Sequence, residues 1–405
     1  MATDALAQSD PALERARRIL NDAPLVDGHN DLPWEIRTFK GGPMNVEAYD
    51  LRQKAPGHTD LARLKEGGVG VQFWSVYVPG EIKDSGFAKV QLEQIDIARR
   101  VIAKYPERLL PATSSADVAR ARKEGKIASF MGMEGGHVLE NSLGALRAYY
   151  DLGARYLTLT HNVTLDWADA ALGETKHGGL TNFGREVVRE MNRLGMLVDL
   201  SHVSPGVMSN ALDVAEAPVI FSHSSARALT DHPRNVPDSI LARLPKNGGV
   251  VMVTFVPGFI NTQVMEYERR AREWRPTGVV EGDTVEYRRQ RQAWRAANPS
   301  PRASLQDVAD HIEHVRKVAG VDHVAIGSDF DGIDTTPEAL EDVSKFPALF
   351  AELVRRGWSD ADLRKLSREN SLRVLKQAED VAARLQKGRA PSVRTIQELD
   401  APAQP

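Results

Sequence analysis

The chain has 405 residues, of which 42% are hydrophobic and 26% charged, so it can build a large apolar core. The formal net charge of −3 excludes a strongly basic surface for nucleic acid or anionic lipid, and a small-molecule partner is expected. There is no cysteine, which excludes disulfides, thiolate metal sites and cysteine nucleophiles. Any metal must therefore be held by His, Asp and Glu.

The N-terminal ten residues are polar, and no stretch of the sequence approaches the roughly 20 apolar residues of a membrane span. We therefore expect a cytoplasmic protein that makes no membrane contact. Residues 5–7 resemble the small-residue end of a cleaved export signal. An exported protein whose signal peptide has been removed is the alternative.

Short and almost continuously apolar runs alternate with helical periodicity along most of the chain. After a helix at residues 11–21, strands are predicted at 24–26, 70–78, 127–133, 156–160, 196–201, 218–222, 249–255 and 323–328. Helices are predicted at 60–65, 89–104, 144–152, 182–194, 205–215, 238–244, 304–318, 341–356 and 360–384. Eight such units indicate a (β/α)8 barrel. An open doubly wound sheet is the rival, but its G-x-G-x-x-G motif after the first strand is missing.

The predicted barrel is a single domain, residues 1–385, followed by a partly extended tail at 386–405. One segment interrupts the alternation: residues 263–298, after the seventh strand, are dense in Arg, Glu and Trp. We predict one or two exposed helices there. Because the charges are mixed, a solvated face or a subunit contact is favoured over a nucleic-acid patch.

Polar residues follow the predicted strands at their C-terminal ends, where active sites of such barrels lie. His29 and Asp31 come first, two residues apart, so their side chains should converge. Alone, this pair is better explained by a capping Asp and a hydrogen-bonded His. The full set at this end comprises His29, Asp31, Glu134, His161, His202, His223 and Asp329.

So many ionisable groups at one end of a barrel would leave several buried charges unpaired unless they hold metal. A dinuclear site fits, since two divalent ions need a bridging carboxylate and separate terminal ligands. Glu134, which precedes Gly135 and Gly136, is the expected bridge.

Several longer motifs accompany these residues. They are Asp27-Gly28-His29-Asn30-Asp31-Leu32-Pro33-Trp34, Gln72-Phe73-Trp74-Ser75-Val76-Tyr77, Glu134-Gly135-Gly136-His137, Leu157-Thr158-Leu159-Thr160-His161, Ser201-His202-Val203-Ser204, Phe221-Ser222-His223-Ser224-Ser225, Arg234-Asn235-Val236-Pro237 and Asp329-Phe330-Asp331-Gly332. With these motifs in order from about residue 25 to 374, the chain resembles the membrane (renal) dipeptidases of the amidohydrolase superfamily.

The resemblance implies a (β/α)8 barrel with two zinc ions per subunit. It places His29, Asp31 and Asp329 around one ion, with Glu134 as the bridge. His202 and His223 would hold the second ion.

The resemblance also implies roles around a zinc-activated water that attacks the peptide carbonyl. His161, free of metal, would hydrogen-bond the developing oxyanion, and Asp329 would relay a proton to the departing amine. Arg234 would bind the substrate carboxylate or the tetrahedral intermediate, unless it is a surface arginine in a Pro-bounded loop. Trp34 and Tyr77 would wall the substrate pocket, although core packing is nearly as well supported.

Other polar residues are expected outside the ligand set. His137 is expected to orient Glu134, and Asp331 to cap or support the site. The remaining histidines considered are expected on the surface or on helices: His232, His311, His314 and His323.

The expected activity is hydrolysis of dipeptides with a free C-terminal carboxylate, with a D-residue tolerated at that position and a homodimer as the assembly. Where mammalian relatives carry tyrosines after strand seven, this chain has Val256-Pro257-Gly258-Phe259, which leaves side-chain preference open. Rival deaminases or lactonases usually begin with H-x-H and often bridge with a modified lysine, unlike His29-Asn30-Asp31 and Glu134. A catalytically silent binding barrel is the remaining alternative.

Overall fold

The computed structural model describes residues 10–82, 86–278 and 284–401. Eight parallel strands form a closed ring, because β2 pairs both with β1 and with β4. The strands of the ring are β1 (Leu25–Asn30), β2 (Val69–Ser75), β4 (Ile127–Glu134), β5 (Ala154–Thr158), β6 (Leu197–Asp199), β7 (Ile220–Ser224), β8 (Val250–Val253) and β9 (Val324–Ile326). This confirms the predicted (β/α)8 barrel.

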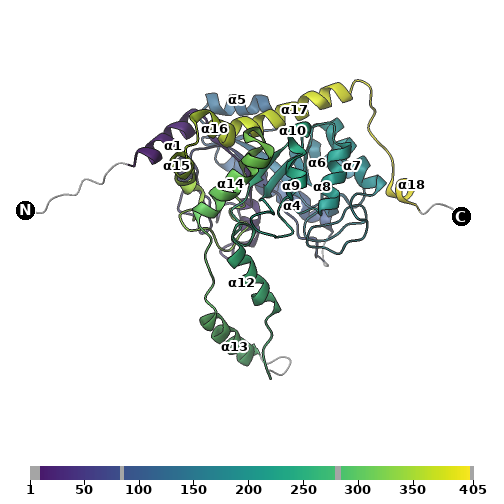
Figure 1. Ribbon diagram of the computed structural model, residues 1–405. Coiled ribbons are helices and arrows are strands. Elements are labelled where there is room, and N and C mark those ends of the chain that lie inside the picture. Colours follow the sequence, from purple (N-terminus) through teal and green to yellow (C-terminus); the bar gives the residue numbers. More distant parts are fainter. Residues whose placement is uncertain (1–9, 83–85, 279–283, 402–405) are drawn as a thin grey trace, which may run out of the picture.

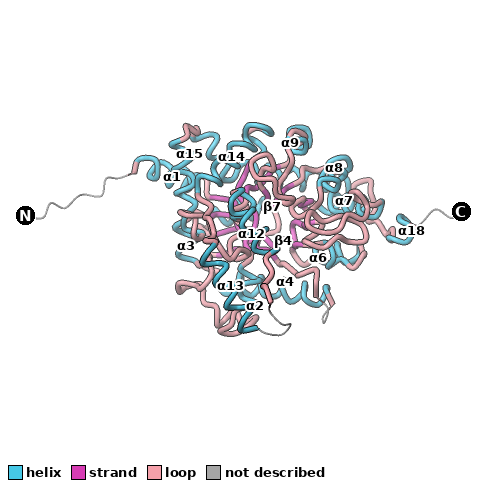
Figure 2. Tube along the Cα trace, turned by 60° about the horizontal axis from the view of Figure 1, so that its bottom comes forward, coloured by secondary structure: helices cyan, strands magenta, loops and turns pink. Residues whose placement is uncertain are grey.

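Helices surround the ring of strands (Figure 2). They are α1 (Pro11–Asp22), α2 (Leu32–Thr38), α3 (Leu61–Glu66), α4 (Phe87–Lys104), α5 (Ser115–Lys123), α6 (Leu143–Asp151), α7 (Asn182–Leu194), α8 (Pro205–Val214), α9 (Asp238–Leu241), α10 (Leu244–Asn247), α11 (Pro257–Ile260), α14 (Leu305–Ala319), α15 (Phe346–Arg355), α16 (Asp360–Arg364) and α17 (Asn370–Leu385). Many begin at a side chain that accepts a backbone N–H, as Ser114 does for α5 and Thr181 for α7.

Among the elements that the sequence did not predict are α2, α5 and the short strand β3 (Leu109–Pro111). β3 pairs with the start of β4 and lies outside the closed ring. Each is short, so its hydrophobic period is difficult to recognise. The predicted helix at 360–384 is real, but a π-helical turn, Lys365–Glu369, joins α16 to α17.

The core has two parts. Side chains such as Val26, Val71 and Phe130 fill the inside of the barrel, and a larger cluster lies between the strands and the helices. Strands β1 and β4 are buried along their whole length, which explains why the strand sequences are almost continuously apolar. Asp27 is a buried exception: its carboxylate accepts from the Ser328 N–H at 2.8 Å and links β1 to the segment after β9.

The segment after β8, for which one or two exposed helices are predicted, forms two, α12 (Thr262–Glu273) and α13 (Thr284–Ala297). They project away from the barrel (Figure 1). Val264 is the only buried residue of α12, and α13 has none. Between the helices, the Arg291 guanidinium lies 5.1 Å from the Trp274 ring and 5.3 Å from the Trp294 ring. We call this segment the arm.

The C-terminal tail is more ordered than expected, since it contains helix α18 (Ile396–Asp400). The Asp400 carboxylate accepts the Asn182 N–H at 2.9 Å, so the tail is tied to the start of α7. None of the helices in the described part of the chain has both the length and the apolar character to cross a membrane.

Candidate active site

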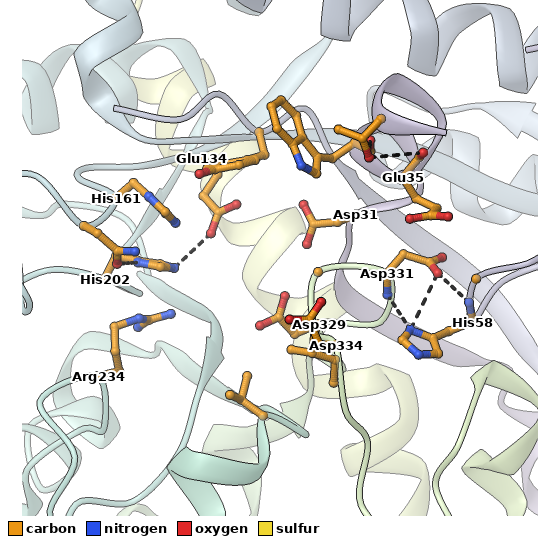
Figure 3. A pocket seen from close by; sticks show the side chains of 18 of the residues that line it. Asp31, Glu35, His58, Glu134, His161, His202, Arg234, Asp329, Asp331 and Asp334 are labelled. Carbon is orange, nitrogen blue, oxygen red and sulfur yellow. Dashed lines mark hydrogen bonds and ion pairs between the residues drawn. The ribbon is translucent and has the colours of Figure 1, made fainter. Parts of the chain in front are cut away.

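A hollow of about 510 Å³ opens at the C-terminal ends of the strands. His161, His202 and Arg234 line one side of it, while Asp31 and Asp331 lie opposite (Figure 3). Because all eight strands are parallel, residues that follow different strands meet at this one end. The predicted site residues are therefore brought together as expected.

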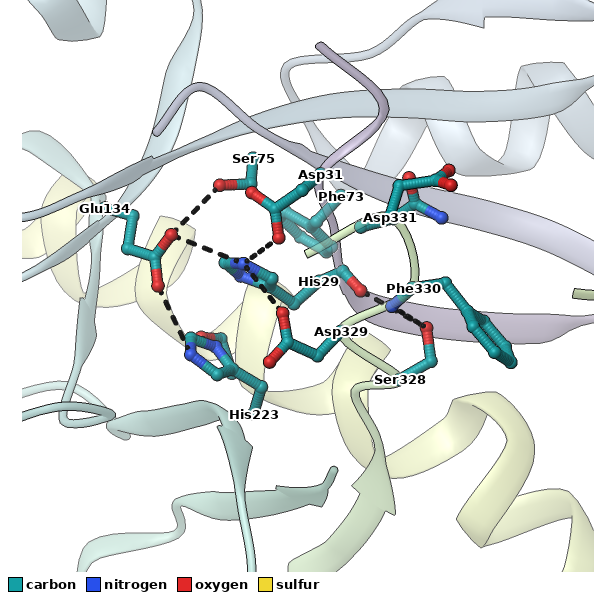
Figure 4. A network of polar contacts seen from close by, with 12 residues as sticks. His29, Asp31, Phe73, Ser75, Glu134, His223, Ser328, Asp329, Phe330 and Asp331 are labelled. Carbon is teal, nitrogen blue, oxygen red and sulfur yellow. Dashed lines mark hydrogen bonds and ion pairs between the residues drawn. The ribbon is translucent and has the colours of Figure 1, made fainter. Parts of the chain in front are cut away.

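His29 and its neighbours form the first group of candidate ligands. His29 Nε2 lies 3.1 Å from Asp31 Oδ2 and 3.8 Å from Asp329 Oδ1. Strand β1 extends further than predicted and includes His29, and Asp31 stands at the N-cap position of α2 without making a capping hydrogen bond. The capping alternative for Asp31 is therefore wrong, and the two side chains converge as expected (Figure 4).

Tyr156 fixes the orientation of the His29 ring. Its hydroxyl lies 2.8 Å from His29 Nδ1, which leaves Nε2 directed at the carboxylates. A Cβ at Gly132 would lie 1.9 Å from the Tyr156 ring, so glycine is required there for the ring to fit. Partners of this kind set the tautomer and direction of metal-binding histidines.

Glu134, at the end of β4, lies between two groups of ligands. Its Oε2 is 3.5 Å from His29 Nε2, while its Oε1 is 2.9 Å from His202 Nε2 and 3.3 Å from His223 Nε2. Ser75 Oγ donates a hydrogen bond of 3.3 Å to Oε2. One carboxylate whose oxygens face opposite groups has the arrangement of a bridging ligand.

His202 and His223 form the second group. Their Nε2 atoms are 2.9 Å apart. The outer Nδ1 of His202 is 3.1 Å from Asn162 Oδ1, and the outer Nδ1 of His223 is 2.8 Å from Ser222 Oγ. Both rings thus turn their inner nitrogens toward Glu134 and toward each other.

Burial makes both of these histidines neutral, the form in which imidazole binds metal. Burial and the nearby Arg234 charge lower the pKa of His202 well below its usual value, and burial lowers the pKa of His223 to about 3. Burial also raises the pKa of Asp329 well above its usual value. Asp329 therefore resists ionisation unless a cation accompanies it.

The residues fit a divalent metal on further structural grounds. Asp31 Oδ1 is buried and has no hydrogen-bond partner among the described residues. Gly332 leaves space in front of the carboxylates, since a Cβ there would lie 2.3 Å from Asp31 Oδ2 and 2.6 Å from Asp329 Oδ1. His202 and Asp329 have left-handed backbones, with φ of 65° and 67°. Strained conformations of this kind often occur at functional sites.

Three overlapping groups bring their ligand atoms within 4.8 Å of one another. They are His29–Asp31–Asp329, His29–Glu134–His223 and Glu134–His161–His202. The third group includes His161, so its geometry allows metal ligation as well as the expected metal-free role. Nitrogen and oxygen ligands in these numbers suit zinc or a related first-row ion.

Arg234 is buried, with 1% of its surface exposed, so the surface-arginine alternative is wrong. Its Nε has no hydrogen-bond partner among the described residues, and its two terminal nitrogens make only long contacts, of 3.5 Å to Ser224 Oγ and 3.4 Å to the His223 carbonyl. Burial lowers the pKa of Arg234 to about 10. The guanidinium is therefore charged and available to an anion in the hollow.

An aromatic wall borders the same hollow. The rings of Trp34 and Tyr77 meet edge to face at 5.0 Å, and the Tyr77 ring lies 4.7 Å from the His161 ring. All three residues line the hollow. His161 Nδ1 is buried without a hydrogen-bond partner in the described part of the chain.

Two expectations about neighbouring residues need correction. Neither ring nitrogen of His137 hydrogen-bonds to Glu134; the ring packs edge-on against Phe87 instead. His232 is neither exposed nor helical: its ring stacks on Phe259 with centroids 4.3 Å apart, and its Nδ1 accepts the Arg234 N–H at 3.2 Å.

Several residues that support the candidate site could not be recognised from the sequence. Tyr156 looked like an ordinary strand residue, and Asn162 and His58 lie in loops. Asp331, expected as a cap or support, accepts the His58 N–H at 2.5 Å and thereby joins two loops of the wall. Only the folded chain brings these partners together.

The fold and the buried ligand groups define a barrel of the metal-dependent hydrolase class. Comparison with known proteins narrows this class: the membrane dipeptidase family, Peptidase family M19, matches residues 13–389. The chain therefore belongs to the membrane dipeptidase family, and it is a metallo-dipeptidase.

The similarity to individual relatives supports the same family. Dipeptidase 3 of Rattus norvegicus is 41% identical over 380 residues, which cover 92% of this chain and 69% of the relative. Among solved structures, the probable dipeptidase PvdM from Pseudomonas aeruginosa is 26% identical with a TM-score of 0.77, covering 92% of this chain and 99% of that one. A metallo peptidase from Rhodobacter sphaeroides, liganded with a phosphinate mimic of the dipeptide L-Ala-D-Ala, is 26% identical with a TM-score of 0.73, covering 88% and 99%.

Proposed function

We propose that this metallo-dipeptidase uses two zinc ions to hydrolyse dipeptides that carry a free C-terminal carboxylate. The observation that carries the proposal is the position of Glu134, whose oxygens face His29 on one side and His202 and His223 on the other. A single carboxylate between two ligand groups favours two ions over one. Family membership makes a deaminase, a lactonase or a silent barrel a weaker alternative.

Arg234 is proposed to receive the substrate carboxylate. Its unpaired Nε and charged guanidinium lie across the hollow from the carboxylates of Asp31, Asp329 and Asp331 (Figure 3). A dipeptide zwitterion would therefore be oriented, with its carboxylate toward Arg234 and its ammonium toward the acidic side.

The other residues would act on the peptide bond itself. Bound zinc supplies Lewis acidity and lowers the pKa of water. His161 would donate a hydrogen bond to the carbonyl oxygen as charge develops on it. Asp329, whose pKa burial raises, would accept a proton from the attacking water and deliver it to the departing amine.

Tolerance of a D-residue at the C-terminal position is also proposed. The support is the Rhodobacter sphaeroides relative, which binds a phosphinate mimic of L-Ala-D-Ala. In this chain Val256 and Phe259 line the hollow on the Arg234 side, where the C-terminal side chain would lie. A homodimer and a cytoplasmic location stay predictions.

The decisive experiment measures turnover of matched L,L- and L,D-dipeptides by protein of measured zinc content, with and without chelator. We expect two zinc ions per chain, activity lost with chelator and restored by zinc, and measurable L,D turnover. One ion per chain at full activity would contradict the dinuclear assignment, and no turnover of any dipeptide would contradict the function.

Arg234→Ala tests the substrate assignment separately. We expect kcat/KM to fall by roughly 100-fold, the loss of a charge-assisted contact, with zinc content unchanged. Arg295→Ala, an exposed arginine on the arm, is the matched control. Normal kcat/KM in Arg234→Ala would remove this residue from the site.

A further inference from the structure

A second hollow, of about 380 Å³, lies at the opposite end of the barrel from the candidate active site. It is bordered by the N-terminal approaches to β1, β2, β3 and β4, by α5 and by the turn between α16 and α17. In Figure 1, α5, α16 and α17 lie at the top of the molecule, and the arm projects from the bottom. The proposed catalytic function does not use this hollow.

The lining carries five basic side chains and no acidic one. The basic residues are Lys65, Arg108, Arg122, Lys126 and Arg368. In a chain of net charge −3, this is a local concentration of positive charge.

Most of these cations lack an acidic partner. Lys126 pairs with Glu124 at 2.7 Å, but no other member of the set forms an ion pair with any described residue. Arg122 Nη2 donates only to the Asp22 carbonyl, at 2.7 Å. Arg368 is partly buried, and its pKa is lowered by burial and by the charge of Arg122, which outweigh the opposite effect of the neighbouring Glu369. The guanidinium groups of Arg122 and Arg368 thus repel each other, and an anion bound between them would relieve this repulsion.

Apart from Asn21, the rest of the lining is apolar or is glycine backbone. Leu20, Pro24 and Val118 supply an apolar surface, and Gly68 and Gly70 contribute no side chain. The volume is in the range of small-molecule sites. Sites for single-stranded nucleic acid require aromatic side chains on which the bases stack, and no aromatic side chain lines this hollow.

We propose that this hollow, defined by Arg108, Arg122 and Arg368, is a binding site for a small organic molecule that bears two phosphate groups. Each phosphate carries nearly two charges and matches the planar guanidinium fork. Two phosphates would neutralise most of the local charge, and the carbon skeleton would rest on the apolar surface.

The test is calorimetric titration of the zinc-loaded, full-length protein with fructose 1,6-bisphosphate as the probe, at constant ionic strength because salt screens such contacts. We expect one site per chain. Arg108→Gln and Arg368→Gln should each weaken binding about tenfold, the loss of one charge-assisted contact. Both variants should retain dipeptidase turnover, which also shows that they fold.

Three controls make the result specific. Arg295→Gln, on the arm, should bind the probe as the unmodified protein does. Arg234→Ala should also bind it unchanged; if binding is lost there and kept in Arg368→Gln, the probe occupies the metal centre and the proposal is wrong. Glutarate, a dicarboxylate, should bind more weakly, and equal affinity would overturn the assignment to phosphate. Absence of binding at about 10 mM probe would overturn the site altogether.

Discussion

At the scale of single residues, the candidate metal centre depends most on Glu134. It is the side chain that approaches both ligand groups, and Ser75 supports one of its oxygens. His29 and His202 are in turn held by Tyr156 and Asn162 on their outer nitrogens. The ligands are therefore oriented by the protein before any metal arrives.

We predict that Glu134→Gln loses metal and activity together, with turnover falling by at least about 100-fold. The amide keeps the shape but replaces a charged oxygen with an NH₂ group that cannot bind metal. Metal content by mass spectrometry and dipeptide turnover, measured on the same sample, check this. Glu47→Gln, a change at a side chain that is 80% exposed, is the control. A Glu134→Gln protein with two ions and full turnover would contradict the bridging role.

His311 allows a pH prediction away from the metal centre. It is buried in α14, where its Nδ1 accepts the Ala226 N–H at 3.0 Å and its Nε2 lies 3.2 Å from the Ile260 carbonyl. In this neutral form Nδ1 already accepts a hydrogen bond, so a second proton on the ring would disrupt that contact. Burial accordingly lowers the pKa of His311 to about 4.

Because the unfolded chain takes up this proton near the ordinary pKa of about 6.5, stability from His311 is present above pH 6.5 and is lost as pH falls toward 4. The loss at pH 5 should be about 2 kcal/mol of unfolding free energy. In His311→Gln, which cannot titrate, the fall between pH 7 and pH 5 should be smaller by about this amount. Denaturant unfolding at both pH values measures the difference, and parallel curves would contradict the prediction.

At the scale of elements, the strands and the arm make different contributions. The strands are buried and deliver the ligands at one end, whereas α12 and α13 bury almost nothing against the barrel. The Trp274 and Trp294 rings pack around Arg291 within the arm itself. Apart from Val264, the arm therefore adds surface without adding to the core.

We predict that replacing residues 266–301 with a short Gly/Ser linker leaves the barrel folded, with Tm changed by no more than about 4 °C. The two ends can be joined, because Asn261 Nδ2 donates to Asp307 Oδ1 at 3.2 Å and the flanking chain segments are adjacent. Scanning calorimetry measures the change, and sedimentation shows whether the arm also serves as a subunit contact. A Tm loss of about 10 °C or more would show that the arm supports the barrel.

At the scale of the whole molecule, closure of the barrel through the β2–β4 pairing brings carboxylates from distant parts of the chain into one buried site. Asp31, Glu134 and Asp329 come from three different strand ends and are buried or nearly so. Their mutual repulsion opposes folding, and a bound cation would relieve it. Metal binding and stability should therefore be linked across the molecule.

We predict that removal of metal by a chelator lowers the free energy of unfolding by about 2.7 kcal/mol, relative to protein with free zinc at about 100 times its Kd. Zinc should restore the lost stability, whereas magnesium should not, because imidazole is a poor ligand for magnesium. Thermal unfolding of the same preparation before and after chelation provides the measurement. An unchanged Tm after complete metal removal would contradict the linkage.

Much of the fold and of the candidate site could be predicted from the sequence. Alternating apolar runs and helical periodicity predict the barrel, and polar residues after those runs, such as His29, Glu134 and His223, are brought together because parallel strands share one C-terminal end. Elements of only a few residues, such as β3, were missed because they contain too little periodicity.

Only the tertiary structure decided how the ligands are held and what else the barrel carries. The Tyr156–His29 contact joins residues 127 positions apart, and the buried Arg234 contacts both His232 and Phe259, whose rings stack on each other. The basic hollow likewise combines Arg108 and Arg368 from segments that show no common pattern in the sequence. Local sequence determines strand and helix periodicity, whereas contacts of this kind depend on register, loop conformation and barrel closure, which are properties of the folded chain.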